Sequence, residues 1–201
     1  MALHLLGRFE FLVGDQRLPI GSPRRQALLA YLALRADGRA TRDHLAGLLW
    51  SEDESRAARH NLRQALLELR RELGPVGAEL IRAGRDDIGL DKTAFEVDVL
   101  AFEKLAWSTN PADHARAVSL CDGPFLDGLA GPSRPFEDWL VAVRERLRLL
   151  ALPVFEKFAA AETTGGQDAV TAARRLLAVD PLDEAAQRLL LRTLATRLSR
   201  E

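Results

Sequence analysis

The feature that most constrains the fold is the helical spacing of apolar residues between Glu54 and Gly74, in the stretch ESRAARHNLRQALLELRRELG. Residues placed at 100° intervals around a helix bring six apolar side chains into one sector. These residues are Ala58, Leu62, Ala65, Leu66, Leu69 and Leu73. Because such a sector is stable only when it is buried, the spacing predicts an amphipathic helix with this face toward a core.

The opposite face of this helix is mostly polar. It carries Arg56, His60, Gln64, Leu67 and Arg71, with Asn61 and Arg63 on its shoulders. Arginine can bind guanine through two hydrogen bonds, and asparagine or glutamine can bind adenine in the same way. A solvated helix also has a polar face, and Glu68 and Glu72 could pair with nearby arginines. Both interpretations remain open from this stretch alone.

The elements before this helix are predicted from alternation and capping signals. Residues 3–20 alternate Phe9, Phe11 and Val13 around a glycine-aspartate turn, which indicates short antiparallel strands. A helix follows, with Ser22 as its N-cap and Pro23 at its first position, and Gly38 lies beyond its end.

A second, shorter helix is expected from Thr41, its N-cap, to Trp50. Ser51 and Glu54 have the spacing of a capping box at the start of the third helix. Gly74 and Pro75 end that helix, and two apolar runs around residues 84–87 predict a hairpin.

This order of elements is typical of a winged helix-turn-helix, in which the second helix of the pair enters the major groove of DNA and the hairpin is the wing. Arg82 and Arg85 of the wing would then contact backbone phosphate. Thr41 and Arg42, at the start of the preceding helix, would hold phosphate with hydroxyl, guanidinium and backbone N–H groups.

The second half of the chain has only helical signals. We expect helices at residues 98–107, 111–121, 134–150, 151–163, 167–179 and 183–198. Breaks at residues 165–166 and 180–181 give the paired-helix cadence of tetratricopeptide-like repeats. The predicted fold is therefore mainly α with small β-sheets: a winged-helix domain at residues 1–95 and an all-α repeat domain at residues 96–201.

Charge and composition limit the possible classes. The net charge is −1, but residues 1–95 contain 15 basic and 13 acidic residues, a net charge of +2, which weakly favours a polyanion partner for the first half. The single cysteine, Cys121, cannot form an internal disulfide and is expected to be a buried small residue. No apolar run approaches about 20 residues, so we expect a cytoplasmic protein without a membrane partner.

No catalytic or metal-binding pattern is present in the sequence. The four histidines lack metal-ligand spacing, and no phosphate-binding loop or nucleophile motif occurs. We therefore expect no enzyme activity, no cofactor and no metal. Trp50, Trp107 and Trp139 are interpreted as core or packing residues. The loop from Cys121 to Trp139 is expected to be ordered because it contains several large apolar side chains.

Several stretches resemble the Streptomyces antibiotic regulatory protein (SARP) family. In the first half these are LLGRFEFLVGDQRLPI, RRQALLAYLALRADGRATRDHLAGLLW and ARHNLRQALLELRRELG. In the second half VDVLAFEKLA, CDGPFLDGL and DPLDEAAQRLLLRTLA are similar to the bacterial transcriptional activator domain of those regulators. The resemblance implies an OmpR-type winged helix, a helical repeat domain, binding to direct repeats in promoter DNA and recruitment of RNA polymerase. Direct repeats would imply two copies arranged head to tail.

The sequence departs from the family pattern in two places. Ile88 and Gly89 stand where the family often has an aromatic residue at the end of the wing, and Asp86 and Asp87 at the wing tip would repel phosphate. The family's helical domain usually continues beyond the position of Glu201. We therefore expect the chain to be the N-terminal portion of a longer regulator, of a kind that also occurs fused to ATPase or cyclase modules.

Two functional hypotheses follow. The first is a sequence-specific DNA-binding transcriptional activator without chemistry of its own. The second is a protein-interaction or sensing module of a larger regulator, in which the winged helix does not bind DNA; the near-neutral first half and the acidic wing tip favour it. A mobility-shift experiment at low salt separates the two, because only the first predicts a specific retarded band.

Overall fold

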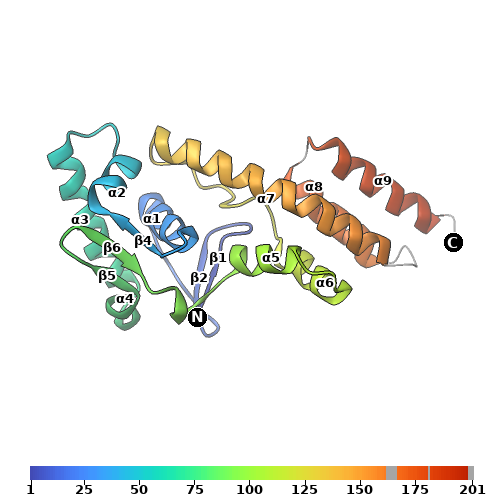
Figure 1. Cartoon of the computed structure of the whole chain (residues 1–201), viewed down its shortest axis with the longest axis horizontal. Coiled ribbons are helices and arrows are strands. Elements are labelled where there is room, and N and C mark those ends of the chain that lie inside the picture. Colours follow the sequence, from blue (N-terminus) through green and yellow to red (C-terminus); the bar gives the residue numbers. More distant parts are fainter. Residues whose placement is uncertain (162–166, 181, 199–201) are drawn as a thin grey trace. The chain divides into compact units, whose positions relative to one another are not determined.

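The chain forms two compact units, which a computed structural model describes for residues 1–161, 167–180 and 182–198 (Figure 1). The N-terminal unit contains residues 1–5, 9–97 and 128–142. The C-terminal unit contains residues 6–8, 98–127 and 143–201. The main division therefore falls between Val97 and Asp98.

A four-stranded sheet opens the N-terminal unit. Its strands are β1 (Ala2–His4), β2 (Glu10–Val13), β3 (Gln16–Leu18) and β7 (Glu96–Val97), in the order β3-β2-β1-β7. The antiparallel pairing of β1, β2 and β3 confirms the prediction for residues 3–20. Strand β7, parallel to β1, was not predicted because two residues are too few to show an alternating pattern.

Three longer helices belong to this unit: α1 (Pro23–Leu34), α2 (Arg42–Leu49) and α3 (Ser55–Glu72). Pro23 occupies the first position of α1, as predicted, and the carbonyl oxygen of Ser22 accepts hydrogen bonds from the next turn, although its side chain does not cap the helix. Thr41 caps α2 as predicted, because its hydroxyl oxygen accepts a hydrogen bond from the His44 N–H at 3.2 Å.

The capping box predicted at the start of α3 is wrong. The helix begins at Ser55, its N-cap is Glu54, and no side chain caps it. Ser51 lies earlier, in a turn closed by a hydrogen bond from the Asp53 N–H to the Trp50 carbonyl oxygen at 3.1 Å. This turn uses the residues that the prediction placed in the first turn of the helix.

The predicted wing is a hairpin in a second small sheet. Strands β5 (Ile81–Ala83) and β6 (Asp87–Leu90) are antiparallel, which confirms the hairpin, and β4 (Arg39–Thr41) completes the order β4-β6-β5. A short helix that was not predicted, α4 (Pro75–Leu80), precedes the hairpin and starts after Gly74, whose φ of +62° suits glycine.

The described part of the C-terminal unit is helical apart from the bridge between residues 6–7 and Phe125. Helices α5 (Asp98–Ala106) and α6 (Pro111–Leu120) pack on each other, as do α8 (Gln167–Val179) and α9 (Glu184–Leu198), which lie side by side in Figure 1. These pairs agree with a repeat-like arrangement of helices, whereas the breaks predicted at residues 165–166 and at residue 181 lie outside the described residues. A further short 3-10 turn, η1 (Lys92–Ala94), belongs to the N-terminal unit.

The predicted break between residues 150 and 151 is wrong. Helix α7 runs without interruption from Arg134 to Ala161, with Pro153 inside it. Proline removes the N–H that would bond to the carbonyl of Leu149, four residues earlier. Leu149 is exposed, so solvent can satisfy that carbonyl, while Val154 and Phe155 next to the proline are buried and hold the helix in place.

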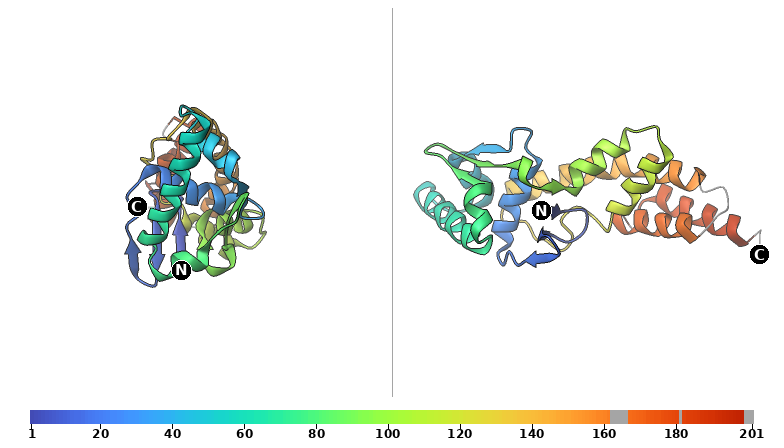
Figure 2. Two further views of the ribbon diagram at one scale, coloured as in Figure 1. Left: turned by 90° about the vertical axis from the view of Figure 1, so that its left-hand side faces the viewer. Right: turned by 90° about the horizontal axis from the view of Figure 1, so that it is seen from below.

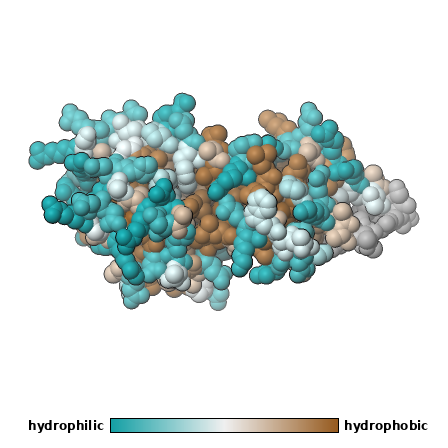
Figure 3. Space-filling model, viewed as in Figure 1, coloured by the Kyte–Doolittle hydropathy of each residue, from teal (hydrophilic) through white to brown (hydrophobic). Residues whose placement is uncertain are grey.

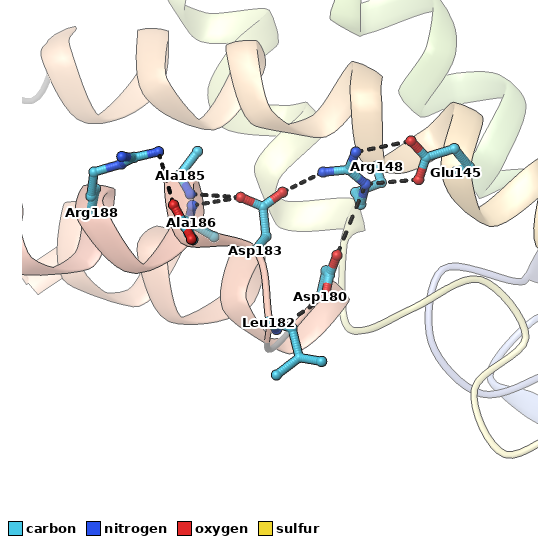
Figure 4. Close-up of polar contacts among 9 residues, drawn as sticks. Glu145, Arg148, Asp180, Leu182, Asp183, Ala185, Ala186 and Arg188 are labelled. Atoms are coloured by element: carbon cyan, nitrogen blue, oxygen red, sulfur yellow. Dashed lines mark hydrogen bonds and ion pairs between the residues drawn. The ribbon is translucent and has the colours of Figure 1, made fainter.

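Arg148 of α7 joins α7 to the start of α9 within the C-terminal unit (Figure 4). Its guanidinium forms two hydrogen bonds with Glu145, at 2.8 and 2.9 Å, and another with Asp183. Asp183 also accepts hydrogen bonds from the N–H groups of Ala185 and Ala186, at 2.8 and 3.1 Å. The backbone N–H of Ala186 and then that of Ala185, together with Arg148, lower the pKa of Asp183 despite desolvation.

The predictions for single apolar residues have mixed outcomes. Cys121 is buried as expected, and burial raises the pKa of its thiol to about 12. Phe125, Leu126 and Phe136 of the loop region are buried, which confirms that the loop is ordered. Trp50 is buried, but Trp107 is 78% exposed, so its interpretation as a packing residue is wrong. Trp107 directly follows the last residue of α5, beyond the part of the helix that packs.

Candidate nucleic-acid interface

Helix α3 turns the predicted face toward the core of the N-terminal unit. All six residues of the apolar sector are buried, with exposed fractions of 7% or less: Ala58, Leu62, Ala65, Leu66, Leu69 and Leu73. On the opposite side Arg56, His60, Gln64 and Arg71 are exposed. The helix lies at the surface of its unit, toward the viewer in the left panel of Figure 2. The orientation predicted from the leucine spacing is therefore confirmed.

The two shoulders of this face differ. Asn61 is half-buried, and its side-chain amide donates a hydrogen bond to the Asp53 carboxylate at 2.8 Å, which ties it to the turn before α3. Arg63 is exposed. In the part of the chain that the structure describes, no ion pair involves Arg56, Arg63 or Arg71.

The two glutamates of α3, Glu68 and Glu72, lie on the flank of the helix that contacts α1. Arg25 of α1 donates hydrogen bonds to both carboxylate oxygens of Glu72, at 2.8 and 2.9 Å, and a further one to Glu68. Around the helix, Glu68 and Glu72 lie on the side away from Arg59 and Arg63. Since α1 engages these carboxylates, they do not neutralise the arginines of α3.

A recess of about 670 Å³ lies between α3, the start of α2 and the turn of the wing. It is lined by Thr41, Arg42, Asp43, Arg59, Leu62, Arg63, Gly84, Arg85 and Asp86. Four of the predicted site residues therefore meet in one place, and the four arginines in this recess outnumber its two aspartates. Such an excess of positive charge in a concave surface attracts anions.

Arg42 has a structural contact that the sequence did not reveal. Its Nε–H donates to the carbonyl oxygen of Gly84 at 3.0 Å, and its backbone N–H donates to the carbonyl oxygen of Asp86 at 2.9 Å. These bonds join the start of α2 to the wing turn. The Nη groups of Arg42 take no part in them, so the residue can position the wing and still offer donors to an anion.

The wing residues are placed differently from one another. Arg85 lies at the turn and lines the recess, whereas Arg82 on β5 pairs with Asp91 at 2.8 Å and does not line it. Of the two acidic residues at the tip, Asp87 pairs with Arg39 at 3.3 Å, and Asp86 lines the recess. The negative charge expected at the wing tip is thus partly neutralised within the unit.

Sequence reasoning missed Arg59 and Asp43. The Nε–H and an Nη2–H of Arg59 donate to the two carboxylate oxygens of Asp43, at 2.7 and 2.9 Å. Hydrogen bonding to Asp43, and then its charge, raise the pKa of the Arg59 guanidinium. The only sequence signal was the position of Arg59, four residues before Arg63 and on the same flank of the helix.

The face of the N-terminal unit drawn in Figure 3 is mostly hydrophilic. Among the described residues no group of three or more histidine, cysteine or acidic side chains could hold a metal ion. No helix in the same ranges has both the length and the apolar character needed to cross a bilayer.

Comparisons with known proteins bear on both halves of the chain. A sequence model of the bacterial transcriptional activator domain family matches residues 90–200. The regulatory protein AfsR of Streptomyces coelicolor is 33% identical over 127 residues, which cover 58% of this chain and 13% of AfsR. The chain thus spans about an eighth of the length of that relative.

A solved structure of EmbR from Mycobacterium tuberculosis, in complex with a low-affinity phosphopeptide, has a similar fold. The TM-score is 0.57 at 19% sequence identity, and the similarity covers 98% of this chain and 68% of the EmbR chain. At this identity the similarity shows the fold alone. Together with the family match and the AfsR relative, it agrees with a winged helix followed by an activator domain. The chain therefore belongs to the bacterial transcriptional activator domain family of SARP-type transcription regulators.

Proposed function

We propose that this transcription regulator binds double-stranded DNA sequence-specifically through α3 of a winged-helix domain at residues 1–95. The exposed polar face of α3, beside a recess lined by Arg59 and Arg63, is the observation that carries the proposal. Leucines fix the helix from the opposite side, so its polar side chains are held on a rigid element. Rigid placement lowers the entropy cost of binding a duplex.

The first half of α3 is the part proposed to read bases. His60 and Gln64 lie one helical turn apart on the exposed face, and Arg56 and Asn61 lie near them. Arg56 and Arg71 are separated by about 22 Å along the helix at a rise of 1.5 Å per residue, whereas the major groove is about 12 Å wide. Arg71 is therefore proposed to contact phosphate beside the groove.

The part of the recess formed by Thr41, Arg42, Arg63 and Arg85 is proposed to hold the DNA backbone. Thr41 at the start of α2 offers its hydroxyl group, and Arg42, Arg63 and Arg85 offer guanidinium groups. Phosphate contacts of this kind fix the register of a protein on DNA without reading its sequence. Arg82, which pairs with Asp91, is proposed to contribute less than Arg85.

Residues 96–201 are proposed to act as the activator part. The family match to the bacterial transcriptional activator domain supports a role in transcription activation, and recruitment of RNA polymerase is the mechanism we propose for it. Binding to direct repeats would place two copies head to tail, because a twofold dimer would require inverted repeats. The helical pairs α5–α6 and α8–α9 offer surfaces for protein partners.

A mobility-shift experiment with genomic fragments, followed by sequencing of the retained DNA, tests the proposal. We expect a specific retarded band at low salt and enriched direct repeats about one helical turn apart. Arg56→Ala should weaken the band, whereas Arg116→Ala, an equal charge change on α6, should not. Absence of any specific band would contradict the proposal.

That negative result would instead favour a protein-interaction module. Asp43 and Asp86 in the recess support this second candidate, because carboxylates reduce the attraction for phosphate. In that case the exposed face of α3 would bind another protein, and pull-down with a candidate partner would depend on Arg56 and Gln64.

A further inference from the structure

The proposed function assigns no role to the ion pair between Arg59 and Asp43. A guanidinium has five N–H donors. Two of them, on the edge formed by Nε and Nη2, are bonded to the carboxylate oxygens of Asp43 at 2.7 and 2.9 Å. Three remain, and two of these lie parallel at the end of the group, on Nη1 and Nη2.

Stability does not explain why the pair is held at this position. Both side chains are exposed, Arg59 to 59% and Asp43 to 67%, and exposed ion pairs contribute little to folding. Helices α2 and α3 are already joined by buried leucines, among them Leu45, Leu49 and Leu62. The pair fixes the direction of the guanidinium at the wall of the recess instead.

The charge of the pair indicates which ligand suits its free edge. Asp43 neutralises Arg59, and its carboxylate would repel a phosphate bound to the same guanidinium. The O6 and N7 atoms of guanine are neutral acceptors that match two parallel N–H groups. The nearby Arg63 and Arg85, which have no ion pair among the described residues, are better suited to phosphate.

We infer that Arg59, buttressed by Asp43, is a base-reading residue that selects a guanine in the major groove. The inference rests on the proposed binding of DNA by α3. Asp43 acts as a positioning residue: it holds the guanidinium in one orientation and prevents it from binding phosphate. It thereby contributes to specificity and lowers non-specific affinity.

Two substitutions in the full chain separate these roles. Arg59→Lys keeps the charge but cannot form two parallel hydrogen bonds. Asp43→Asn removes the carboxylate charge and leaves a neutral side chain of the same size. Asp15→Asn, in the exposed turn between β2 and β3, is the matched control for the change in charge.

Sequencing of duplexes retained from a random library measures the base preference at each position for the four proteins. Arg59→Lys and Asp43→Asn should both lose preference for guanine at the same single position, on the order of tenfold. Asp43→Asn should also bind non-specific duplex more tightly and with a steeper salt dependence. Asp15→Asn should keep the wild-type motif. Thermal melts check that all four proteins are folded.

The outcomes distinguish this inference from the proposed function. If the wild-type protein selects a motif and the two substitutions leave it unchanged, or alter different positions, Arg59 does not read guanine and only the inference falls. It also falls if Asp43→Asn weakens binding to every sequence. If the wild-type protein selects no motif, both the inference and the proposed function are overturned.

Discussion

Arg148 of the C-terminal unit and Arg63 of the N-terminal unit have opposite surroundings. In the C-terminal unit Arg148 forms ion pairs with the carboxylates of Glu145, Asp180 and Asp183, all within the same unit. In the N-terminal unit Arg63 is exposed at a recess, and the carboxylates of α3 are bound by α1 instead. An arginine whose charge is balanced by three carboxylates of its own fold has little attraction left for a polyanion. This difference in pairing is one reason why DNA binding is proposed for the N-terminal unit.

The largest predicted effect on DNA recognition concerns the exposed face of α3. Gln64→Ala should remove about 1–3 kcal/mol of discrimination at one base position, because an amide that bonds two base atoms would be lost. Arg42→Ala should weaken binding to all sequences alike, because phosphate contacts carry no base information. Binding to the selected duplex and its single-base variants measures both effects. Loss of preference at many positions in Gln64→Ala would show that the assigned face is wrong.

The network of Arg148 should matter for stability and not for DNA. Asp183→Ala should lower the free energy of unfolding by about 0.5–2 kcal/mol, because it removes the N-cap of α9 and a partner of Arg148. Arg63→Ala should change the same quantity by less than about 0.5 kcal/mol. Urea denaturation measures both. An equal loss of stability in the two variants would contradict the claim that Arg148 and its partners stabilise the fold more than Arg63 does.

Acid should weaken the same network. The pKa of Asp183 is lowered in the folded protein from its ordinary value of 3.8, so its contribution is present above that value and is lost as the pH falls through the folded pKa. The difference in stability between wild type and Asp183→Asn should therefore shrink on acidification below pH 3.8. Urea midpoints at a series of pH values test this. A difference that grows toward low pH would contradict the assigned role.

The smallest effect is expected at Trp107. Because its side chain is 78% exposed, Trp107→Ser should change the free energy of unfolding by less than about 0.5 kcal/mol. Phe102→Ala, in helix α5, which ends just before Trp107, should cost about 3–5 kcal/mol because Phe102 is buried. Thermal melts compare the two. A large loss in Trp107→Ser would restore the packing role that the sequence suggested.

The orientation of α3 could be predicted from the sequence because it depends on a local property, the position of leucines around a helix. The same holds for the cap at Thr41 and for the hairpin of the wing. Contacts between distant residues were beyond this reasoning: the bonds from Arg42 to the wing turn and from Arg59 to Asp43 depend on how three elements meet. The spacing of residues in the sequence does not show which elements contact one another in the fold.

Two errors came from giving local signals too much weight. A helix end was expected between residues 150 and 151, but α7 continues through Pro153, because its buried neighbours Val154 and Phe155 hold the helix in place. Ser51 and Glu54 have the spacing of a capping box, but the turn from Trp50 to Asp53 moves the start of α3 to Ser55. In both places tertiary structure outweighed a local preference, by mechanisms that a pattern of spacing cannot reveal.

The salt dependence of DNA binding tests the central claim most directly. The logarithm of the binding constant should fall linearly with the logarithm of salt concentration, and Arg63→Ala should reduce the slope by about 1, because one phosphate contact is lost. Arg188→Ala, an equal charge change on α9, should leave the slope unchanged. Fluorescence anisotropy with the selected duplex gives both slopes. Equal slopes for wild type and Arg63→Ala, or a reduced slope for Arg188→Ala, would contradict the claim that α3 presents its arginines to DNA.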